Sequence, residues 1–378
     1  MIKTFILLIS VIFLAQTGRT QAGQQASDFI ITIPERSTTT TREFANYLRQ
    51  NFKTDTARIK AIYGWITHNI SYDLALLQNR ASMEGKAPPT ADDVLKTKKG
   101  VCQGYATLFV DLCTALNIKA QMVPGYGKIG TQLIPLSHAW VAAQLDGKWY
   151  LFDPTWGAGY VENNVFVKSF NRRFYMVNPE QMLKDHMPFD PMHQFINHPV
   201  NNKEFIDGQT AVNKSKPFFN YNDTLKLHEA LSKTDKFRAE ARRLESSGVA
   251  NDLIREQLRQ LRKGIEVYGS NDSYAKAIEH HNRAGAIYTQ YLEHRKKKFS
   301  AIDDASLLKM IDSVSYHTNL SRSILFTIVP KDEAYRQNLA GFHQNIEKFQ
   351  KGIVAEKEMI NRYLAMDKTG RERFFGTR

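Results

Sequence analysis

Cysteine is nearly absent from this sequence, with 2 residues among 378. A scaffold of several disulfides and a metal cluster built on many cysteines are therefore both excluded. Acidic residues are scarce relative to basic ones, because 38 Asp and Glu against 51 Lys and Arg give a net charge of +13. This excess favours anionic partners such as nucleic acid, acidic glycans or lipid headgroups, but it does not identify a chemistry.

Long apolar runs are also absent, apart from one near the N-terminus. Residues 5–15 (FILLISVIFLA) follow Lys3 and precede a small-residue site at Thr20 and Ala22. A run of this length is too short for a bilayer span, which needs roughly 20 residues, but it is typical of a secretory signal peptide. We expect residues 1–22 to be a signal peptide and the mature chain to be periplasmic, cell-surface or extracellular. A short N-terminal anchor is the alternative.

The hydrophobic pattern changes near residue 205. Residues 27–200 mix helical and strand-like periodicities, which predicts an α+β domain. Residues 201–224 are polar and rich in turn formers, which indicates a linker. Residues 225–378 keep a helical spacing throughout and predict an all-α domain. Its clearest seam resembles a short coiled coil and consists of Leu339, Phe342, Ile346, Phe349 and Ile353.

Two helices and a hairpin are predicted in the α+β domain. Arg58–Ile70 carries an amphipathic stripe with Asp55 as a plausible N-cap, and Val101–Asn117 has an apolar face of its own. Asp146 and Gly147 stand between two apolar runs, which is a strong signal for a two-residue β-turn.

The expected turn fixes which residues of the hairpin oppose each other. Their numbers sum to 293, so that Trp140 faces Asp153 and His138 faces Thr155. His138 and Asp153 then become diagonal neighbours on one face of the sheet. A carboxylate in that position orients the imidazole and stabilises its charged form.

Cys102 stands where Gly100 leads into the second predicted helix. A helix N-terminus lowers the pKa of a thiol, because its free N–H groups and dipole favour the thiolate. Cys113 follows at a separation of about 16 Å along a helix, which is beyond the roughly 7 Å that a disulfide allows. We therefore expect Cys113 to be a core residue. A buried thiol at 102, a structural His138 and a turn-starting Asp153 remain the structural alternatives.

The segments around these residues resemble the transglutaminase-like superfamily, a papain-like cysteine fold, in its secreted bacterial form. The similar segments are YGWITHNISYD at 63–73, KKGVCQGYATLFVDLC at 98–113, VPGYGK at 123–128, SHAWVAAQLDGKWYLFDPTWG at 137–157 and FYMVNPE at 174–180. The resemblance implies a helix that carries the cysteine and packs on an antiparallel sheet. It also implies Cys102 as nucleophile, His138 as general base and acid, and Asp153 as orienting carboxylate. The region after 205 is not covered.

Other parts of a catalytic cleft are less determined. The backbone N–H of Cys102 is the first oxyanion donor, and the side-chain donor is Gln103, Trp65 or Tyr126. Tyr126, Trp140 and Trp156 are candidates for lining the substrate cleft.

No metal or other cofactor is expected. The histidines at 186, 193 and 198 are spaced by seven and five residues, which matches no compact metal motif.

The sequence therefore predicts a cysteine-dependent enzyme that acts on amide or peptide bonds through a thioester. Water as acceptor makes it a protease or amidase, and a primary amine makes it a transglutaminase. The expected substrate is a peptide or protein, including cell-wall peptide, and nucleic acid is not expected. The alternative is a non-catalytic binding or scaffold module. The basic run His294–Lys298 is best explained as a solvated helix face, and contact with an anionic surface is the alternative.

Overall fold

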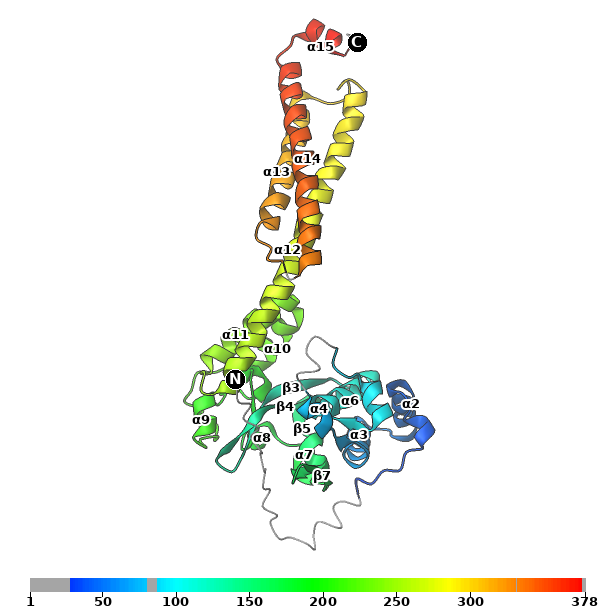
Figure 1. Ribbon diagram of the computed structural model, residues 1–378, viewed down its shortest axis with the longest axis vertical. Coiled ribbons are helices and arrows are strands. Elements are labelled where there is room, and N and C mark those ends of the chain that lie inside the picture. Colours follow the sequence, from blue (N-terminus) through cyan, green and yellow to red (C-terminus); the bar gives the residue numbers. More distant parts are fainter. Residues whose placement is uncertain (1–27, 80–86, 331, 376–378) are drawn as a thin grey trace, which may run out of the picture. The chain divides into compact units, whose positions relative to one another are not determined.

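A computed structural model describes residues 28–79, 87–330 and 332–375. The expected signal peptide at residues 1–22 lies outside this described part. The chain forms two compact units, shown in Figure 1. The first unit comprises the described residues up to Ala230 together with Arg242–Leu258, and the second comprises Leu231–Ala241 and the chain from Arg259 onward.

The first unit is built on a four-stranded antiparallel sheet with the order β5-β4-β3-β8. The strands are β3 (Ala120–Ile129), β4 (Gln132–Leu145), β5 (Lys148–Phe152) and β8 (His186–Pro188). The hairpin register is confirmed, because Val141 pairs with Phe152 and Leu145 with Lys148, each pair summing to 293. Asp146 and Gly147 form the expected two-residue turn, and both have the positive φ that a type I′ turn requires.

Helices cover one face of this sheet. They are α2 (Thr41–Asn51), α3 (Asp55–Asn69), α5 (Ala91–Thr97) and α6 (Cys102–Ala115). Val141 and Ala143 of β4 and Phe152 of β5 join the core that these helices bury. The expected N-cap of α3 is wrong by one residue: Thr54 is the cap, and its hydroxyl accepts from the Ala57 N–H. Threonine satisfies this free N–H group as well as aspartate does.

A second, smaller core includes Trp140 and Ala142. These residues alternate along β4 with Val141 and Ala143, so they point to the opposite face of the sheet. Leu225 of α10 (Tyr221–Ala230) packs into this core. Phe205 of α9 (Asn202–Ile206) is also fully buried. Residues 201–224, which we expected to be a linker, thus contain a helix and belong to the compact first unit. Their polar composition hides the few apolar residues that pack.

The second unit consists of helices. Most of it lies in α12 (Asp252–Lys296), α13 (Asp304–Leu325) and α14 (Glu333–Leu364). Buried residues recur along α14 every seven positions, at Leu339, Ile346, Ile353 and Ile360. This spacing keeps one face of the helix against its neighbours. The α+β core followed by a large helical region agrees with the expected fold class.

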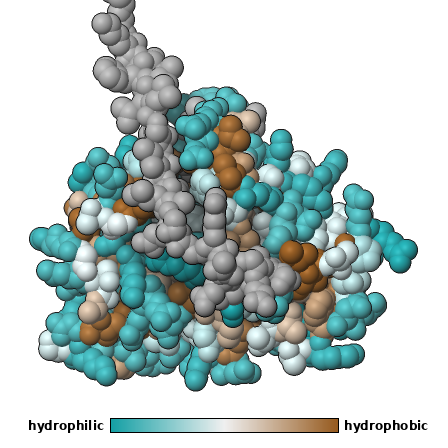
Figure 2. Space-filling view, turned by 90° about the horizontal axis from the view of Figure 1, so that it is seen from below, coloured by the Kyte–Doolittle hydropathy of each residue, from teal (hydrophilic) through white to brown (hydrophobic). Residues whose placement is uncertain are grey.

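The remaining elements are shorter. They are η1 (Glu35–Ser37), β1 (Ser71–Tyr72), α4 (Leu74–Gln78), β2 (Lys99–Gly100), α7 (Pro154–Ala158), β6 (Gly159–Glu162), β7 (Val165–Lys168), η3 (Arg172–Phe174), α8 (Pro179–Met182), η4 (Pro191–Gln194), α11 (Lys233–Ser246) and α15 (Lys368–Phe374). Among the described residues, no helix is both long enough and apolar enough to span a membrane. On the face drawn in Figure 2, the hydrophobic residues form separate small patches among hydrophilic ones.

Candidate active site

Cys102 is the first residue of α6, which begins one residue later and ends two residues earlier than the predicted helix over Val101–Asn117. The preceding residue, Val101, is extended and offers no side-chain cap, so the first N–H groups of α6, next to Cys102, are left without a capping side chain. Cys102 is partly exposed, whereas Cys113 is fully buried in the core, and neither forms a disulfide. Burial raises the pKa of the Cys113 thiol, so that this cysteine stays protonated and unreactive.

His138 of β4 and Asp153 meet beyond the end of the hairpin. The Nε2 of His138 lies 2.7 Å from Oδ2 of Asp153. Strand β5 ends at Phe152, however, so the expected ladder pairing of His138 with Thr155 is wrong. Pro154 cannot continue the ladder, and Thr155 lies in α7 instead.

Asp153 serves two structures with its two oxygens. Its Oδ1 accepts from the backbone N–H groups of Thr155 and Trp156, at 2.8 and 3.0 Å, and thereby caps α7. Its Oδ2 remains for the imidazole of His138. The turn-starting role and the orienting role, which the sequence left as alternatives, are therefore both present in one side chain.

The thiol and the imidazole are also bonded to each other. His138 makes a hydrogen bond with the side chain of Cys102, and the backbone N–H of Ala139 donates to the same sulfur. Because Nε2 of His138 is taken by Asp153, Nδ1 is the nitrogen that serves the thiol. The structure thus connects Cys102, His138 and Asp153 in one hydrogen-bonded chain.

Electrostatics in this chain favour the charged pair. Burial alone would raise the pKa of the Cys102 thiol, but the hydrogen bond and charge of His138 lower that pKa below its usual range. Burial alone would lower the pKa of the His138 imidazole, but the charge and hydrogen bond of Asp153 raise that pKa well above its usual range. Both shifts favour the ion pair of thiolate and imidazolium over the neutral pair.

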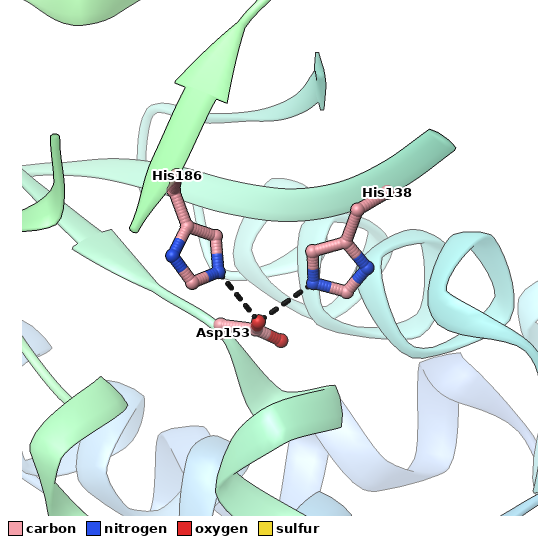
Figure 3. A group of neighbouring side chains, drawn as sticks. All are labelled: His138, Asp153 and His186. Carbon is pink, nitrogen blue, oxygen red and sulfur yellow. Dashed lines mark hydrogen bonds and ion pairs between the residues drawn. The ribbon is translucent and has the colours of Figure 1, made fainter. Parts of the chain in front are cut away.

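A second histidine, which the sequence analysis did not assign to the site, reaches the same carboxylate. The Nε2 of His186 lies 3.0 Å from Oδ2 of Asp153, and its Nδ1 lies 2.7 Å from Oδ1 of Asp185. Figure 3 shows the imidazoles of His186 and His138 both pointing at Asp153. The segment FYMVNPE in the family resemblance stops six residues before His186, and no local pattern marked this histidine.

His138, Asp153 and His186 also form a group close enough to bind a metal ion, with ligand atoms within 4.8 Å of one another. Direct hydrogen bonds join the three side chains, so each imidazole Nε2 already has the carboxylate oxygen as its partner. The geometry therefore fits a hydrogen-bonded network.

Two cavities of the first unit meet at His138. One has a volume of about 380 Å³ and is lined by Cys102, Gln103 and His138 among others. The other has a volume of about 510 Å³ and is lined by His138, Thr155 and Trp156 among others. Trp156 stacks on the imidazole of His138 at a centroid distance of 5.1 Å. Of the oxyanion and cleft candidates, Gln103 and Trp156 thus line the cavities.

Tyr126 does not line either cavity, contrary to expectation. Its ring is fully buried and its hydroxyl donates to Oδ1 of Asn202 at 2.8 Å. The flanking glycines accommodate the protein itself, because a Cβ at Gly125 would lie 2.2 Å from the carbonyl oxygen of Met187. Glycine at these positions lets β8 approach β3, not a substrate.

Trp140 and Trp65 are likewise core residues and not cleft residues. Trp140 is fully buried in the smaller core and touches His186 edge-on at 5.0 Å. Trp65 of α3 packs on Phe44 at 4.9 Å, with the ammonium of Lys98 above its ring. Large aromatic rings gain most free energy where they can bury their whole surface, which explains both placements. Neither cavity is lined by these two tryptophans.

Comparisons with known proteins agree with this geometry. Residues 42–154, which include Cys102, His138 and Asp153, match the transglutaminase-like superfamily. Human kyphoscoliosis peptidase is 35% identical over 43% of this chain and 25% of its own length. Cytokinesis protein 3 of Schizosaccharomyces pombe is 25% identical over 40% of this chain and 17% of its own length. The chain thus spans about a quarter or less of the length of these curated relatives.

Two crystal structures are also similar to part of the chain. One, of a Cytophaga hutchinsonii protein, is 24% identical over 40% of this chain and 50% of that chain, with a TM-score of 0.25. The other, of a TGase, is 17% identical over 41% of each chain, with a TM-score of 0.25. The curated relatives named above are eukaryotic and give no support to the secreted bacterial type that the sequence resembles.

Proposed function

We propose that this protein is a cysteine-dependent enzyme that cleaves amide or peptide bonds through a thioester. The observation that carries the proposal is the single hydrogen-bonded chain from Cys102 through His138 to Asp153 at the meeting point of two cavities. If these residues only stabilised the fold, nothing would require a partly exposed thiol to lie next to a buried imidazole whose pKa is raised.

The proposed reaction begins with the Cys102 thiolate, which attacks the carbonyl carbon of the substrate. The tetrahedral intermediate collapses when Nδ1–H of His138 protonates the leaving amine, and a thioester remains on the sulfur. His138, now neutral, removes a proton from a water molecule that attacks the thioester. The C–S bond then breaks, and the product leaves as a carboxylic acid. Cys102 is left as thiolate, and His138 keeps the proton taken from water, which restores the starting ion pair.

The oxyanion of each tetrahedral intermediate needs hydrogen-bond donors close to Cys102. We propose the Cys102 backbone N–H, because the first N–H groups of α6 have no partner within the helix. The amide of Gln103 is the side-chain candidate, since this residue is exposed and lines the same cavity as the thiol.

The chemistry of the cavities supports an uncharged substrate. Among the described lining residues of both cavities, His138 is the one that can carry a positive charge, and no Asp, Glu, Lys or Arg lines either. Apolar side chains such as Leu76, Met122 and Phe166 dominate the walls. We propose a peptide with apolar residues beside the cleaved bond, and water as the acceptor, because nothing acidic in the lining would attract the ammonium group of a lysine.

Export is the second part of the proposal. It rests on the short apolar run at residues 5–15 and the small-residue site at Thr20 and Ala22. N-terminal sequencing of the protein recovered outside the cytoplasm is expected to begin at Gly23. Recovery of full-length protein from the cytoplasm would contradict export and leave the enzymatic proposal in place.

A mixture of peptides that includes cell-wall peptides tests the activity directly. We expect the purified protein to cleave members of this mixture, with preference for apolar residues at the cleaved bond. Product masses separate the outcomes: backbone scission indicates a protease, loss of ammonia an amidase, and incorporation of an added primary amine a transglutaminase. If no peptide changes mass and Cys102→Ala preserves the biological phenotype, the protein is a scaffold and the enzymatic proposal is wrong.

A further inference from the structure

We propose that His186, held by Asp185, is a positioning residue that orients Asp153 and thereby tunes the Cys102–His138 pair. The inference rests on the proposed function of that pair. It extends the triad by three residues, His186, Asp185 and Arg173, into a relay that ends near the surface at Arg173.

Backbone pairing places His186 in this position. Strand β8 pairs with β3 so that His186 is opposite Gly127. A Cβ at Gly127 would lie 2.9 Å from the ring of Trp156, so glycine makes room for the ring that covers both histidines. The backbone N–H of Lys128 donates to the carbonyl oxygen of Asp185 at 2.9 Å. These contacts fix the chain at 185 and 186 before any side-chain bond is considered.

The hydrogen bonds of Asp153 are complete when His186 is included. Its Oδ1 accepts from two backbone N–H groups, and its Oδ2 accepts from the Nε2 atoms of His138 and His186. A carboxylate has about four acceptor positions, so all of them are used. Asp153 is 0% exposed, and water cannot replace a donor that is lost.

Asp185 determines which way the His186 ring faces. Its Oδ1 lies 2.7 Å from Nδ1 of His186, which leaves Nε2 to point at Asp153. Each ring nitrogen of His186 thus lies against a carboxylate oxygen. Arg173 holds the other oxygen of Asp185. His186 itself is fully buried and lines neither cavity, so a direct role on substrate is not supported.

Few other ionisable groups act on Asp153. The phenols of Tyr63 and Tyr105 feel its charge, but burial raises their pKa above the usual range and keeps them neutral. The charge and hydrogen bond of His186, after those of His138, lower the pKa of Asp153. Loss of His186 leaves Oδ2 of Asp153 with His138 as its one side-chain partner and removes the contact that holds the carboxylate in its orientation. A carboxylate that turns away from His138 supports the imidazolium less, and the pKa of the Cys102 thiol is then expected to rise.

The test is the rate at which iodoacetamide alkylates Cys102 between pH 4 and 9, followed by peptide mass. We expect His186→Leu to shift the midpoint of this rate upward by about one pH unit, which corresponds to about a tenfold lower rate below the midpoint. Asp185→Asn should shift it in the same direction by less. His186→Gln keeps an N–H at about the same distance from the backbone and should restore the rate to within about twofold.

His198→Leu is the matched control, because it also removes one imidazole hydrogen bond from the first unit, the one to the Lys216 carbonyl, without touching Asp153. Its midpoint should equal that of the unsubstituted protein. A wild-type midpoint in His186→Leu overturns the inference, as does a His186→Gln variant that behaves like His186→Leu. If His186→Leu does not fold, a wild-type midpoint in Asp185→Asn has the same meaning. An ordinary thiol midpoint near pH 8.5 in the unsubstituted protein contradicts the proposed function instead.

Discussion

Buried polar side chains are arranged differently in the two compact units. In the first unit, Asp153 and His186 are fully buried and bonded to each other although 33 positions separate them in the sequence. In the second unit, the fully buried hydroxyls of Thr318 and Ser321 donate to backbone carbonyls of the helices. A buried charge needs charged or hydrogen-bonding side chains around it, whereas a single backbone carbonyl satisfies a buried hydroxyl. The difference locates the chemistry in the first unit and packing in the second.

The largest effect should follow from removal of the thiol. We expect Cys102→Ala to lower peptide turnover by at least about 10³-fold, because the nucleophile is lost while the fold is kept. Turnover of the cleaved peptides, measured by product mass, checks this. Cys113→Ala removes the other cysteine from the core and should leave turnover in place. Equal loss in both variants would contradict the assignment of the nucleophile.

A smaller but still large effect should follow from removal of the imidazole. His138→Ala takes away the hydrogen bond and charge that lower the pKa of Cys102, so that most of the thiol is protonated at neutral pH. We expect iodoacetamide labelling of Cys102 at pH 7 to slow by roughly 30-fold, as for a thiol with an ordinary pKa near 8.5. His280→Ala, in the second unit, changes a histidine that lies 3.0 Å from His317 and should leave the labelling rate unchanged.

Substitutions in the core of the second unit should change the stability of the protein and leave the reactivity of Cys102 unchanged. Ile346 is fully buried in the heptad face of α14, and Ile346→Ala is expected to destabilise the protein by about 2–5 kcal/mol through the cavity it leaves. Val354 on the same helix is 53% exposed, so Val354→Ala should cost less than about 0.5 kcal/mol. Urea unfolding measures both. The rate of Cys102 labelling should not change in either variant, and a parallel loss of labelling would mean that the site depends on the helical unit.

The smallest expected effect concerns pH and His193, a half-buried histidine outside the relay. Burial, reinforced by the charges of His228 and Arg243, lowers the pKa of His193 to about 4. The unfolded chain binds this proton near pH 6.5, before the folded chain does, so stability should fall as the pH drops from about 6.5 to 4. His193→Gln removes this dependence. Melting temperatures measured across that range should therefore decline less steeply in the variant, and identical slopes would show that His193 is already charged when folded.

Local patterns predicted the parts of the site that lie close together in sequence. The turn at Asp146 and Gly147 determined the hairpin register, and the register brought His138 near Asp153. The start of α6 at Cys102 followed from the residues around it. These features depend on contacts within a few positions along the chain, where backbone conformation and turn chemistry decide the outcome.

Aromatic residues were predicted less well. Tyr126 and Trp140 were candidates for lining the cleft and Trp65 was a candidate oxyanion donor, yet all three pack in the interior. Whether a ring faces a cavity or a core depends on which segment covers it. For Tyr126 and Trp140 the covering segments include β8 and residues beyond 200, whose positions no local pattern reveals.

The amino-acid order alone determined the helix that presents the thiol, the hairpin that carries the imidazole and the seven-residue repeat of the last long helix, because each depends on neighbours along the chain. Only the folded structure decided that a fourth side chain, His186, shares the carboxylate of Asp153. Strand β8 reaches that carboxylate by pairing with β3 some sixty positions earlier. Such a pairing is chosen by the free energy of the whole sheet and its two cores, and short sequence patterns contain no trace of it.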